Sequence, residues 1–377
     1  MLTNLKHVFS KDFSIVLNST MKPLSFVIVG SGWRSLFYVR IAKRYPKHFR
    51  LLYMLCRTEE KADAMAKDYG IETTTSESIC EQTYPDFVVI AVTKGNLFAE
   101  TKKWSEKGFP VLSETPVVAN VDELKTIWNM VQNGAKIQVA EQYHRYPVIA
   151  SGLREIAEGK IAEPNAVELS VAHDYHGISL IRRMLQPQEP LRLKLKSVRG
   201  ASYHFPVTET NSREGVVTDG SVKERERVRI TMEFQNGKVA FYDFDKVQYH
   251  SFIRSRRLQV QGSNGEWNDT IIRYINSDSI TNTKKIFPLL EKKYGCLETR
   301  ELQNLKTRWC PYIIMDDMQD EYAIATMMYD MREYIEYGTE IYPLAEALED
   351  TYIWLLFQEA IKYPNKEILP EAMPWQI

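Results

Sequence analysis

The 377-residue chain has few cysteines, no long apolar run and almost no net charge. Its cysteines, Cys56, Cys80, Cys296 and Cys310, never approach the C-x-x-C spacing of zinc and redox motifs. No apolar run of about 18 residues occurs, which excludes a conventional membrane-spanning helix. With 48 basic and 49 acidic residues, the overall charge favours neither nucleic acid nor a membrane surface as a partner. We expect a cytoplasmic protein without a metal site.

The first twenty residues lack a long apolar segment followed by a small-residue cleavage site, so they do not read as a secretory signal. We interpret residues 1–20 as an N-terminal extension, with Met21 as a possible functional start. At about 150 residues per domain, the length predicts two packed domains. The 44% hydrophobic and 26% charged residues are typical of an ordinary globular protein.

From Ser25 onwards, short apolar runs alternate with helical patterns, which predicts βαβ units and a parallel sheet. Strands are expected at 25–29, 51–55, 87–92, 110–114 and 136–143. Helices are expected at 33–44, 59–69, 98–107 and 121–132. The predicted fold class is therefore α/β, with a doubly wound, Rossmann-type dinucleotide-binding domain over residues 21–146.

After Pro147 the pattern changes to a helix at 148–158 and then longer alternating runs, which suit an antiparallel or mixed sheet with one face covered. Such runs occur at 166–171, 198–205, 226–245 and 257–267, and Asn236-Gly237 within them is a strong hairpin signal. Helices at 320–337 and 344–362 close the chain, and much of 275–315 has no clear period. We predict an α+β substrate-binding and oligomerisation domain over 147–377, with the terminal helices packing back.

The most specific motif is the glycine turn G-S-G-W-R-S at 30–35, between the first strand and the first helix. Gly30 allows the tight turn, and Gly32 lets the backbone approach a pyrophosphate at the helix N-terminus. Trp33, Arg34 and Ser35 complete the expected cofactor-binding turn. Ser35 stands where a third glycine normally permits close packing of the helix on the strand.

The end of the second strand carries Arg57 and Thr58 where an NAD-binding domain would place an acidic residue for the ribose hydroxyl. A guanidinium and a hydroxyl suit a 2′-phosphate, so we predict NADP, with NAD as the second choice. The alternative is that Arg57 is a solvated charge at a strand end.

Taken in order, these features resemble the glucose-fructose oxidoreductase and inositol dehydrogenase family (Gfo/Idh/MocA). The resemblance rests on the glycine turn, V-L-S-E-T-P at 111–116, A-E-Q-Y-H-R-Y-P at 140–147, the hairpin signals and Y-P-L-A-E-A at 342–347. It implies hydride transfer between a nicotinamide and a carbinol carbon of a sugar or cyclitol. It further implies an open, mainly antiparallel sheet in the second domain, with Glu114 at the cofactor. Where the sixth strand leaves the first domain, Gln142 would contact the cofactor and Tyr143 or His144 the substrate; the alternative is a role in packing between the domains.

Catalytic groups implied by the resemblance are a lysine, an aspartate and a histidine. Thr115 occupies the lysine position, and a hydroxyl cannot act as a general acid near neutral pH. His176 occupies the histidine position and, with an ordinary pKa near 6.5, suits acid and base roles. His173 or Asp174 would orient it or replace the missing carboxylate, with Tyr175 beside the substrate. The alternative for His176 is a histidine satisfied by main chain at a helix start.

Thr93, Lys94 and Asn96 follow the fourth strand, at the sheet edge where such domains bind ligands. Lys94 either reaches a cofactor phosphate or is a solvated loop charge. Two functions stay open: an NADP-dependent oxidoreductase acting on a carbohydrate-like substrate, or a dinucleotide-binding sensor or assembly protein that has lost catalysis. An open sheet also predicts a homodimer or homotetramer.

Overall fold

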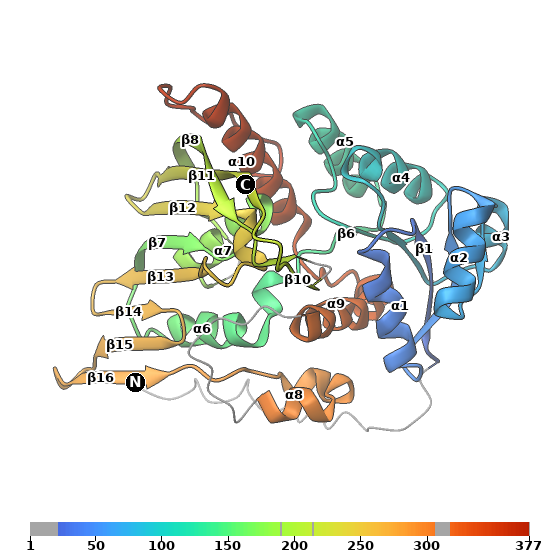
Figure 1. The fold of residues 1–377 in the computed structure, drawn as a ribbon, viewed down its shortest axis with the longest axis horizontal. Coiled ribbons are helices and arrows are strands. Elements are labelled where there is room, and N and C mark those ends of the chain that lie inside the picture. Colours follow the sequence, from blue (N-terminus) through green and yellow to red (C-terminus); the bar gives the residue numbers. More distant parts are fainter. Residues whose placement is uncertain (1–21, 189–190, 213–214, 306–316, 377) are drawn as a thin grey trace, which may run out of the picture.

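The computed structural model describes residues 22–376 except for 189–190, 213–214 and 306–316. The predicted extension at 1–20 and the proposed start at Met21 lie outside these residues. The described chain forms two large sheets, each with helices packed against it, and one small two-stranded sheet (Figure 1). None of the described helices has the length and apolar character needed to cross a bilayer.

The N-terminal sheet contains six parallel strands in the order β3-β2-β1-β4-β5-β6. Their bounds are β1 Leu24–Val29, β2 Phe49–Leu55, β3 Thr73–Thr74, β4 Phe87–Ile90, β5 Val111–Ser113 and β6 Ile137–Val139. The strand order reverses between β1 and β4, and open α/β sheets commonly bind ligands at the carboxyl ends of the strands at such a point. The predicted doubly wound sheet is confirmed.

Helices α1 Ser35–Arg44, α2 Glu59–Tyr69, α3 Glu77–Gln82, α4 Lys94–Glu106 and α5 Val121–Gln132 connect these strands. The observed bounds of α2 and α5 are those predicted, because each helix carries its own cap. The side chain of Thr58 accepts a hydrogen bond from the Lys61 N–H group, and that of Asn120 accepts one from Glu123. Helix α1 begins later than predicted because the Ser35 N–H group closes a turn onto the Gly32 carbonyl.

The second sheet has the order β16-β15-β14-β13-β7-β12-β11-β8. Its strands are β7 Pro164–Ser170, β8 Leu195–Thr208, β11 Val222–Phe234, β12 Val239–Asp245, β13 Arg257–Gly262, β14 Gly265–Asn268, β15 Ile271–Ile275 and β16 Thr281–Lys285. Only the β7–β12 pair among these is parallel. Gly237, at a φ of 79°, lies in the predicted hairpin between β11 and β12. The mainly antiparallel sheet is confirmed.

A separate two-stranded sheet and several short elements complete the fold, and some of these lie in the segment that the sequence left unassigned. The pair β9 Asn211–Ser212 and β10 Gly215–Val216 lies between β8 and β11. Strand β16, the 3₁₀ turn η3 Lys292–Leu297 and helix α8 Arg300–Leu305 lie in the 275–315 segment. The run predicted at 257–267 is the β13–β14 hairpin, which turns between Gly262 and Gly265.

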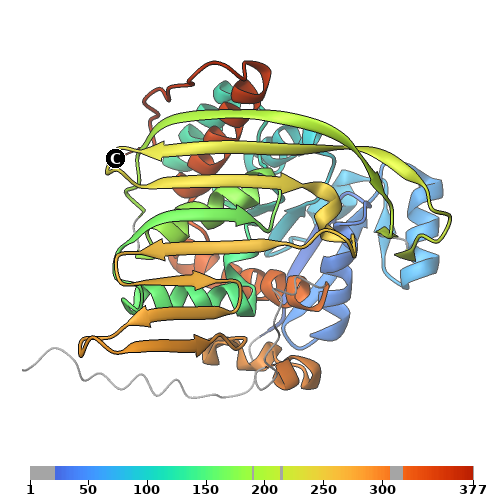
Figure 2. The same cartoon turned by 60° about the vertical axis from the view of Figure 1, so that its left-hand side comes forward.

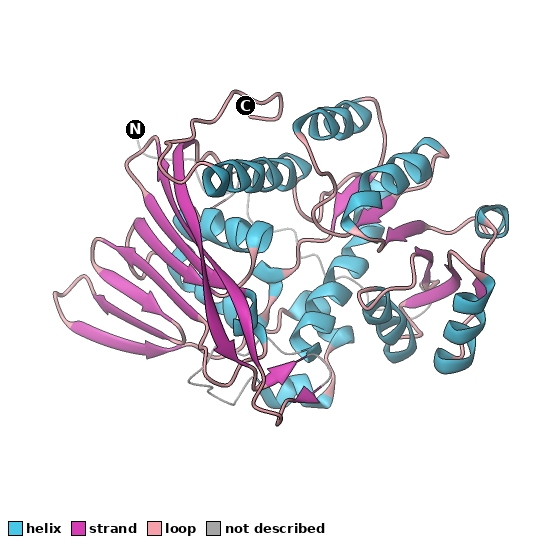
Figure 3. Cartoon of the chain, turned by 45° about the horizontal axis from the view of Figure 1, so that its top comes forward, coloured by secondary structure: helices cyan, strands magenta, loops and turns pink. Residues whose placement is uncertain are grey.

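Three helices lie along one face of the second sheet: α6 Pro147–Ala157, α7 Asp174–Leu185 and α10 Leu344–Lys362. Figure 3 shows these helices on the side facing the first domain, and Figure 2 shows the opposite face without a helix over it. The remaining long helix, α9 Asp317–Tyr337, packs on α1, and its buried side chains share a core with β1 and β2. The end of the chain therefore joins the two domains.

Candidate active site

The glycine turn lies at the carboxyl end of β1, beside the point where the strand order reverses. Gly30 has a φ of +111°, and a Cβ atom there would fall 2.4 Å from the Ala91 carbonyl oxygen, so a glycine is required. A Cβ atom on Gly32 would meet nothing within 4 Å, which leaves open space over the turn. Ser35 is fully buried and donates a long hydrogen bond to the Ala91 carbonyl, at 3.4 Å. The turn therefore fits a dinucleotide, and Ser35 is compatible with close helix–strand packing.

Arg57 and Thr58 follow β2 and are both exposed. The Gly30 N–H group donates to the Leu55 carbonyl at 3.0 Å, so the glycine turn and the end of β2 lie next to each other. Thr58 accepts the Lys61 N–H group at 3.3 Å as the cap of α2, and its side chain also hydrogen-bonds Glu60.

Arg34, Glu114 and Gln142 meet in a buried cluster with Asp320 of α9. Arg34 Nε lies 3.0 Å from Glu114 Oε1, and Arg34 Nη1 lies 2.6 Å from Asp320 Oδ2. The Gln142 amide donates to Asp320 Oδ1 at 2.9 Å, and the Tyr38 hydroxyl donates to Glu114 at 2.6 Å. The structure thus brings three predicted cofactor residues together, with side chains that join α1, β5, η1 and α9.

Trp33, by contrast, is 45% exposed on the outside of the turn, where its ring contacts Phe37 edge-on. Thr93 and Asn96 are exposed at the start of α4, and the Asn96 amide donates to the Thr93 hydroxyl at 3.2 Å. Lys94 extends from the same helix start toward the second domain, with its Nζ atom 5.6 Å from the centre of the Trp354 ring. Burial lowers the pKa of Lys94, an effect that nearby Asp174 opposes.

His176 is held between a carboxylate and a hydroxyl. Its Nδ1 atom lies 2.5 Å from Glu141 Oε2, and its Nε2 atom lies 3.3 Å from Thr115 Oγ1. The ring is 7% exposed and packs on the Tyr143 ring at a centroid distance of 4.2 Å. Of the expected catalytic groups, the structure thus brings Thr115 and His176 into direct contact. Tyr143, predicted at the substrate, supports the imidazole.

A second histidine lies beside this group. His173 Nδ1 is 2.7 Å from the Tyr249 hydroxyl, which also accepts the backbone N–H group of His173. The His173 and His176 rings are 5.1 Å apart at their centroids, edge to face. Burial raises the pKa of Tyr249 to about 12, so this phenol keeps its proton at neutral pH.

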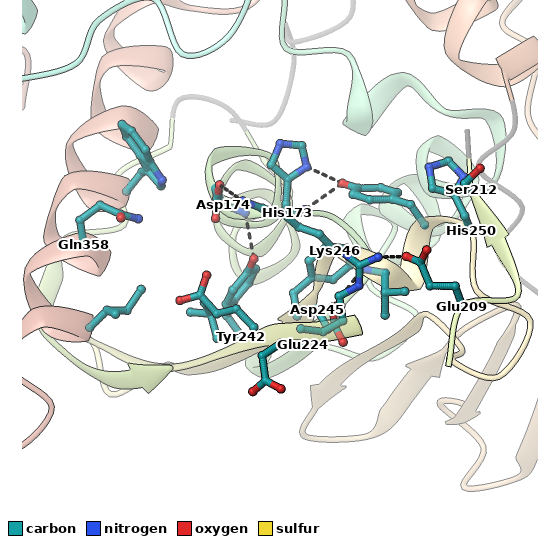
Figure 4. Close-up of a pocket in the computed structure, with 18 of the residues that line it drawn as sticks. His173, Asp174, Glu209, Ser212, Glu224, Tyr242, Asp245, Lys246, His250 and Gln358 are labelled. Carbon is teal, nitrogen blue, oxygen red and sulfur yellow. Dashed lines mark hydrogen bonds and ion pairs between the residues drawn. The ribbon is translucent and has the colours of Figure 1, made fainter. Parts of the chain in front are cut away.

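Asp174 has a φ of 45°, which is rare for a residue with a side chain. Its N–H group donates to the Tyr242 hydroxyl at 2.8 Å, an interaction drawn in Figure 4. The Asp174 carboxylate lies 3.9 Å from Lys246 Nζ. The carboxylate that contacts His176 is Glu141. The sequence predicted that His173 or Asp174 would orient His176 or replace the missing carboxylate, and this contact is made by Glu141 instead.

His173 and Asp174 open onto a cavity of about 800 Å³ (Figure 4). Its walls come from the starts of α4 and α7, from β11, β12 and η2 Lys246–Tyr249, and from α10. The lining mixes charged, polar and aromatic side chains: Lys94, Glu209, Glu224, Arg225, Glu226, Tyr242, Lys246, Tyr249, His250, Trp354 and Gln358. Many hydrogen-bonding groups with aromatic surfaces suit a polar, hydroxyl-rich molecule.

Tyr175 and His144 do not line this cavity. Tyr175 is 2% exposed within the core of the second domain, and burial raises its pKa well above the ordinary value. The His144 ring packs 5.4 Å from the Tyr342 ring, and burial together with Arg183 and Arg145 lowers its pKa well below 6.5. Both side chains turn into the protein because the helices that carry them present that face to the interior.

Three site residues were missed from the sequence: Glu141, Tyr249 and Asp320. Glu141 lies within the predicted strand at 136–143 and in the A-E-Q-Y segment, so its position near a carboxyl strand edge was an available signal. Tyr249 and Asp320 come from distant parts of the chain, and nothing in their local sequence marks them. Within the described residues, no group of three or more histidine, cysteine or acidic side chains lies close enough to hold a metal ion.

The fold and the site together define a two-domain protein with a dinucleotide-binding domain. Residues 24–142 match the model of the Gfo/Idh/MocA family, described as an oxidoreductase family with an NAD-binding Rossmann fold. Residues 24–142 are therefore similar to the NAD-binding domain of these oxidoreductases, in agreement with the resemblance found in the sequence. No curated protein matches the sequence significantly.

Solved structures resemble the chain over nearly its whole length. Levoglucosan dehydrogenase, in complex with NADH and levoglucosan, is 16% identical with a TM-score of 0.67, covering 93% of this chain and all (100%) of that one. An NAD-binding oxidoreductase from Klebsiella pneumoniae is 14% identical, with the same coverages and TM-score. UDP-N-acetylglucosamine 3-dehydrogenase from Acidithiobacillus ferrooxidans is 14% identical with a TM-score of 0.63, covering 92% and 100% of the two chains. At these identities the likeness establishes the fold of both domains.

Proposed function

We propose that the chain is an NADP-dependent oxidoreductase that transfers a hydride between the nicotinamide and a carbinol or carbonyl carbon of a sugar- or cyclitol-like molecule. The observation that carries this proposal is His176, held by Glu141 and Thr115 at the ends of β5 and β6. An imidazole oriented by a buried carboxylate is a standard acid–base arrangement. The sugar dehydrogenases among the similar structures support the substrate class.

Binding of the dinucleotide falls to residues at the carboxyl edge of the first sheet. The backbone at Gly30 and Gly32 and the start of α1 would hold the pyrophosphate, and Arg57 with Thr58 would hold the ribose phosphate. The nicotinamide, when bound, supplies or accepts the hydride. We propose NADP over NAD because the Arg57 position carries a cation and no acidic side chain.

The substrate would occupy the cavity next to His173. The cavity is lined by carboxylates, an amide, imidazoles and ammonium groups, each of which can bind a substrate hydroxyl. The rings of Tyr242 or Trp354 can cover an apolar face of a sugar. His176, whose ring lies 5.1 Å from that of His173, would accept or return the proton of the reacting oxygen. The absence of a lysine at position 115 favours one alternative, a dinucleotide-binding protein that has lost catalysis.

These functions are separated by a substrate screen with a single-site control. Sugars, cyclitols and their oxidised forms are added to the protein with each nicotinamide dinucleotide, and the absorbance of the reduced nicotinamide is followed. We expect turnover with at least one compound, a loss of roughly 10² to 10⁴-fold in His176→Ala, and little change in dinucleotide affinity. Binding without turnover for every compound would favour the sensor, and full turnover in His176→Ala would remove this histidine from the mechanism.

We further propose that the open face of the second sheet forms a homodimer or homotetramer interface. The face carries a charged network in which Arg227 pairs with Asp243 through two hydrogen bonds, with Phe241 exposed on the same strand as that aspartate. An uncovered sheet of this size is commonly buried by a second copy. Light scattering at micromolar concentration should report an oligomer, and a monomer would contradict this proposal.

A further inference from the structure

Glu141 makes two contacts that determine which nitrogen of His176 carries the proton. Its carboxylate is fully buried, with Oε1 accepting the Tyr143 N–H group at 3.0 Å and Oε2 facing His176 Nδ1 at 2.5 Å. A carboxylate accepts hydrogen bonds and has none to donate, so Nδ1 must be the protonated nitrogen. The lone pair of the neutral ring is then on Nε2, the atom that faces Thr115.

Thr115 is placed to connect this nitrogen to a reacting oxygen. Its hydroxyl is 3.3 Å from Nε2, so the Thr115 O–H group can donate to the imidazole and its oxygen can accept from a substrate hydroxyl. Thr115 is only half-buried, whereas His176 is 7% exposed and the Glu141 carboxylate is not exposed at all. Thr115 is thus the most exposed of the three groups, and Glu141 is the least exposed.

We propose that Thr115, His176 and Glu141 form a proton relay in which the threonine hydroxyl contacts the substrate and Glu141 is a positioning residue. This inference rests on the proposed function. In the oxidation direction the substrate C–H bond breaks, and the hydride passes to the oxidised nicotinamide. The substrate O–H proton moves to Thr115 Oγ1 as the Thr115 proton moves to His176 Nε2. The products are a carbonyl, the reduced dinucleotide and an imidazolium that Glu141 stabilises.

The relay gives Thr115 a role that does not require it to be an acid. A hydroxyl that receives one proton while giving up another stays neutral, so its own high pKa does not limit the transfer. The proton is instead held by the imidazole, whose ordinary pKa is near neutrality. Other titratable groups face His176 from η1 and α7: Tyr143 stacks on the ring, His173 lies edge-on at 5.1 Å, and Tyr175 lies at 5.7 Å.

Nitrogen-15 NMR of the His176 ring tests the carboxylate directly, without any need for turnover. The wild type should show a protonated Nδ1 atom and an unprotonated Nε2 atom. Glu141→Gln keeps the side chain's shape but can donate its amide to Nδ1, so the tautomer should invert. Glu155→Gln, on α6 against Lys284, is the matched buried control and should leave the tautomer unchanged. An unchanged tautomer in Glu141→Gln would overturn the proposal.

Kinetics with the substrate found in the screen test the threonine. We expect Thr115→Val to lower kcat roughly 10²-fold or more, Thr115→Ser to retain most of it, and both to bind NADPH like the wild type. Glu141→Gln should lower kcat by a similar factor and alter its pH profile, with a smaller effect on KM. Full kcat in Thr115→Val, with His176→Ala inactive, would overturn the relay and leave the proposed oxidoreductase standing. An inverted tautomer in a protein without turnover would overturn the proposed function instead, and the relay with it.

Discussion

The glycine turn shows at the residue scale how two neighbouring glycines serve different purposes. Gly30 is needed for the backbone, because of its φ of +111° and because an added Cβ atom would lie 2.4 Å from the Ala91 oxygen. Gly32 has no such neighbour, so its small size matters only for a molecule that approaches from outside. The two positions can therefore be separated experimentally.

We expect Gly30→Ala to lower the free energy of unfolding by at least about 1–3 kcal/mol, the usual cost of a strained backbone, because a steric clash adds to that strain. Gly32→Ala should leave the free energy of unfolding nearly unchanged and weaken NADPH binding, because the added methyl group fills the space over the turn. Urea unfolding and a fluorescence titration measure the two effects. Equal stability losses in both variants would contradict the assignment of separate roles.

Arg57 provides the second prediction at this scale. Its exposed guanidinium is proposed to pair with a ribose phosphate, so Arg57→Ala should weaken NADPH binding roughly tenfold and leave NADH binding unchanged. Arg50→Ala, at an exposed position on strand β2, which precedes Arg57 in the chain, is the control. If NADPH and NADH affinities fall equally in Arg57→Ala, the side chain does not read the phosphate.

At the residue scale, His176 could be predicted from the sequence, but its partner Glu141 could not. His176 was identified by resemblance, and the structure places it against the predicted Thr115. Glu141 escaped because it reaches His176 only when β6 and the start of α7 are brought together, across 35 positions of sequence. Local patterns do not encode such a contact. For the same reason Arg34, which reads locally as a turn residue, is found in an ion-pair cluster with Asp320.

The elements were predicted best where a helix or strand is specified by its own residues. Helix α2 has acidic residues in its first turn, a Thr58 cap and Gly70 at a φ of 53° after its end, and its bounds matched the prediction. The short helix α3 and strand β3 were missed because six and two residues give too little periodicity. Strand β6 is shorter than predicted, since the chain leaves the sheet after Val139 and turns into η1.

The docking of α9 gives a prediction at the scale of elements. Arg34 supplies the cation between Glu114, which directly follows β5, and Asp320 on α9, and its side chain is 19% exposed. Arg34→Met should lower the free energy of unfolding by about 3 kcal/mol, because two partly buried carboxylates lose their partner. The double variant Arg34→Met/Asp320→Asn should recover part of this loss. An unchanged urea midpoint in Arg34→Met would show that the cluster does not stabilise α9.

At the scale of the whole molecule, the sheet classes followed from the hydrophobic patterns alone. Continuous apolar runs gave the parallel sheet, and alternating runs gave the mainly antiparallel one. The way the domains meet did not follow, because it depends on which surface the terminal helices cover. Helix α9 shares a core with the first domain, whereas α10 packs on β8 and α7 of the second.

The buried His144 should make the free energy of unfolding depend on pH. Burial and two nearby arginines lower its folded-state pKa well below the 6.5 of the unfolded chain. The unfolded state therefore takes up a proton first as the pH falls, so the contribution of neutral His144 is complete above pH 6.5 and is lost below it. The free energy of unfolding should fall below pH 6.5 less steeply in His144→Asn than in the wild type. Parallel pH profiles for the two proteins would contradict the depressed pKa.

The central claim is that this chain binds a nicotinamide dinucleotide at the glycine turn and uses it for hydride transfer. A titration of the purified protein with NADPH and with NADH, with mass spectrometry of any cofactor that co-purifies, tests it most directly. We predict saturable binding of both reduced dinucleotides, tighter for NADPH, that weakens in Gly32→Ala. If neither NADPH nor NADH binds, the account is contradicted, because the Rossmann-type domain would then not bind the dinucleotide that hydride transfer requires.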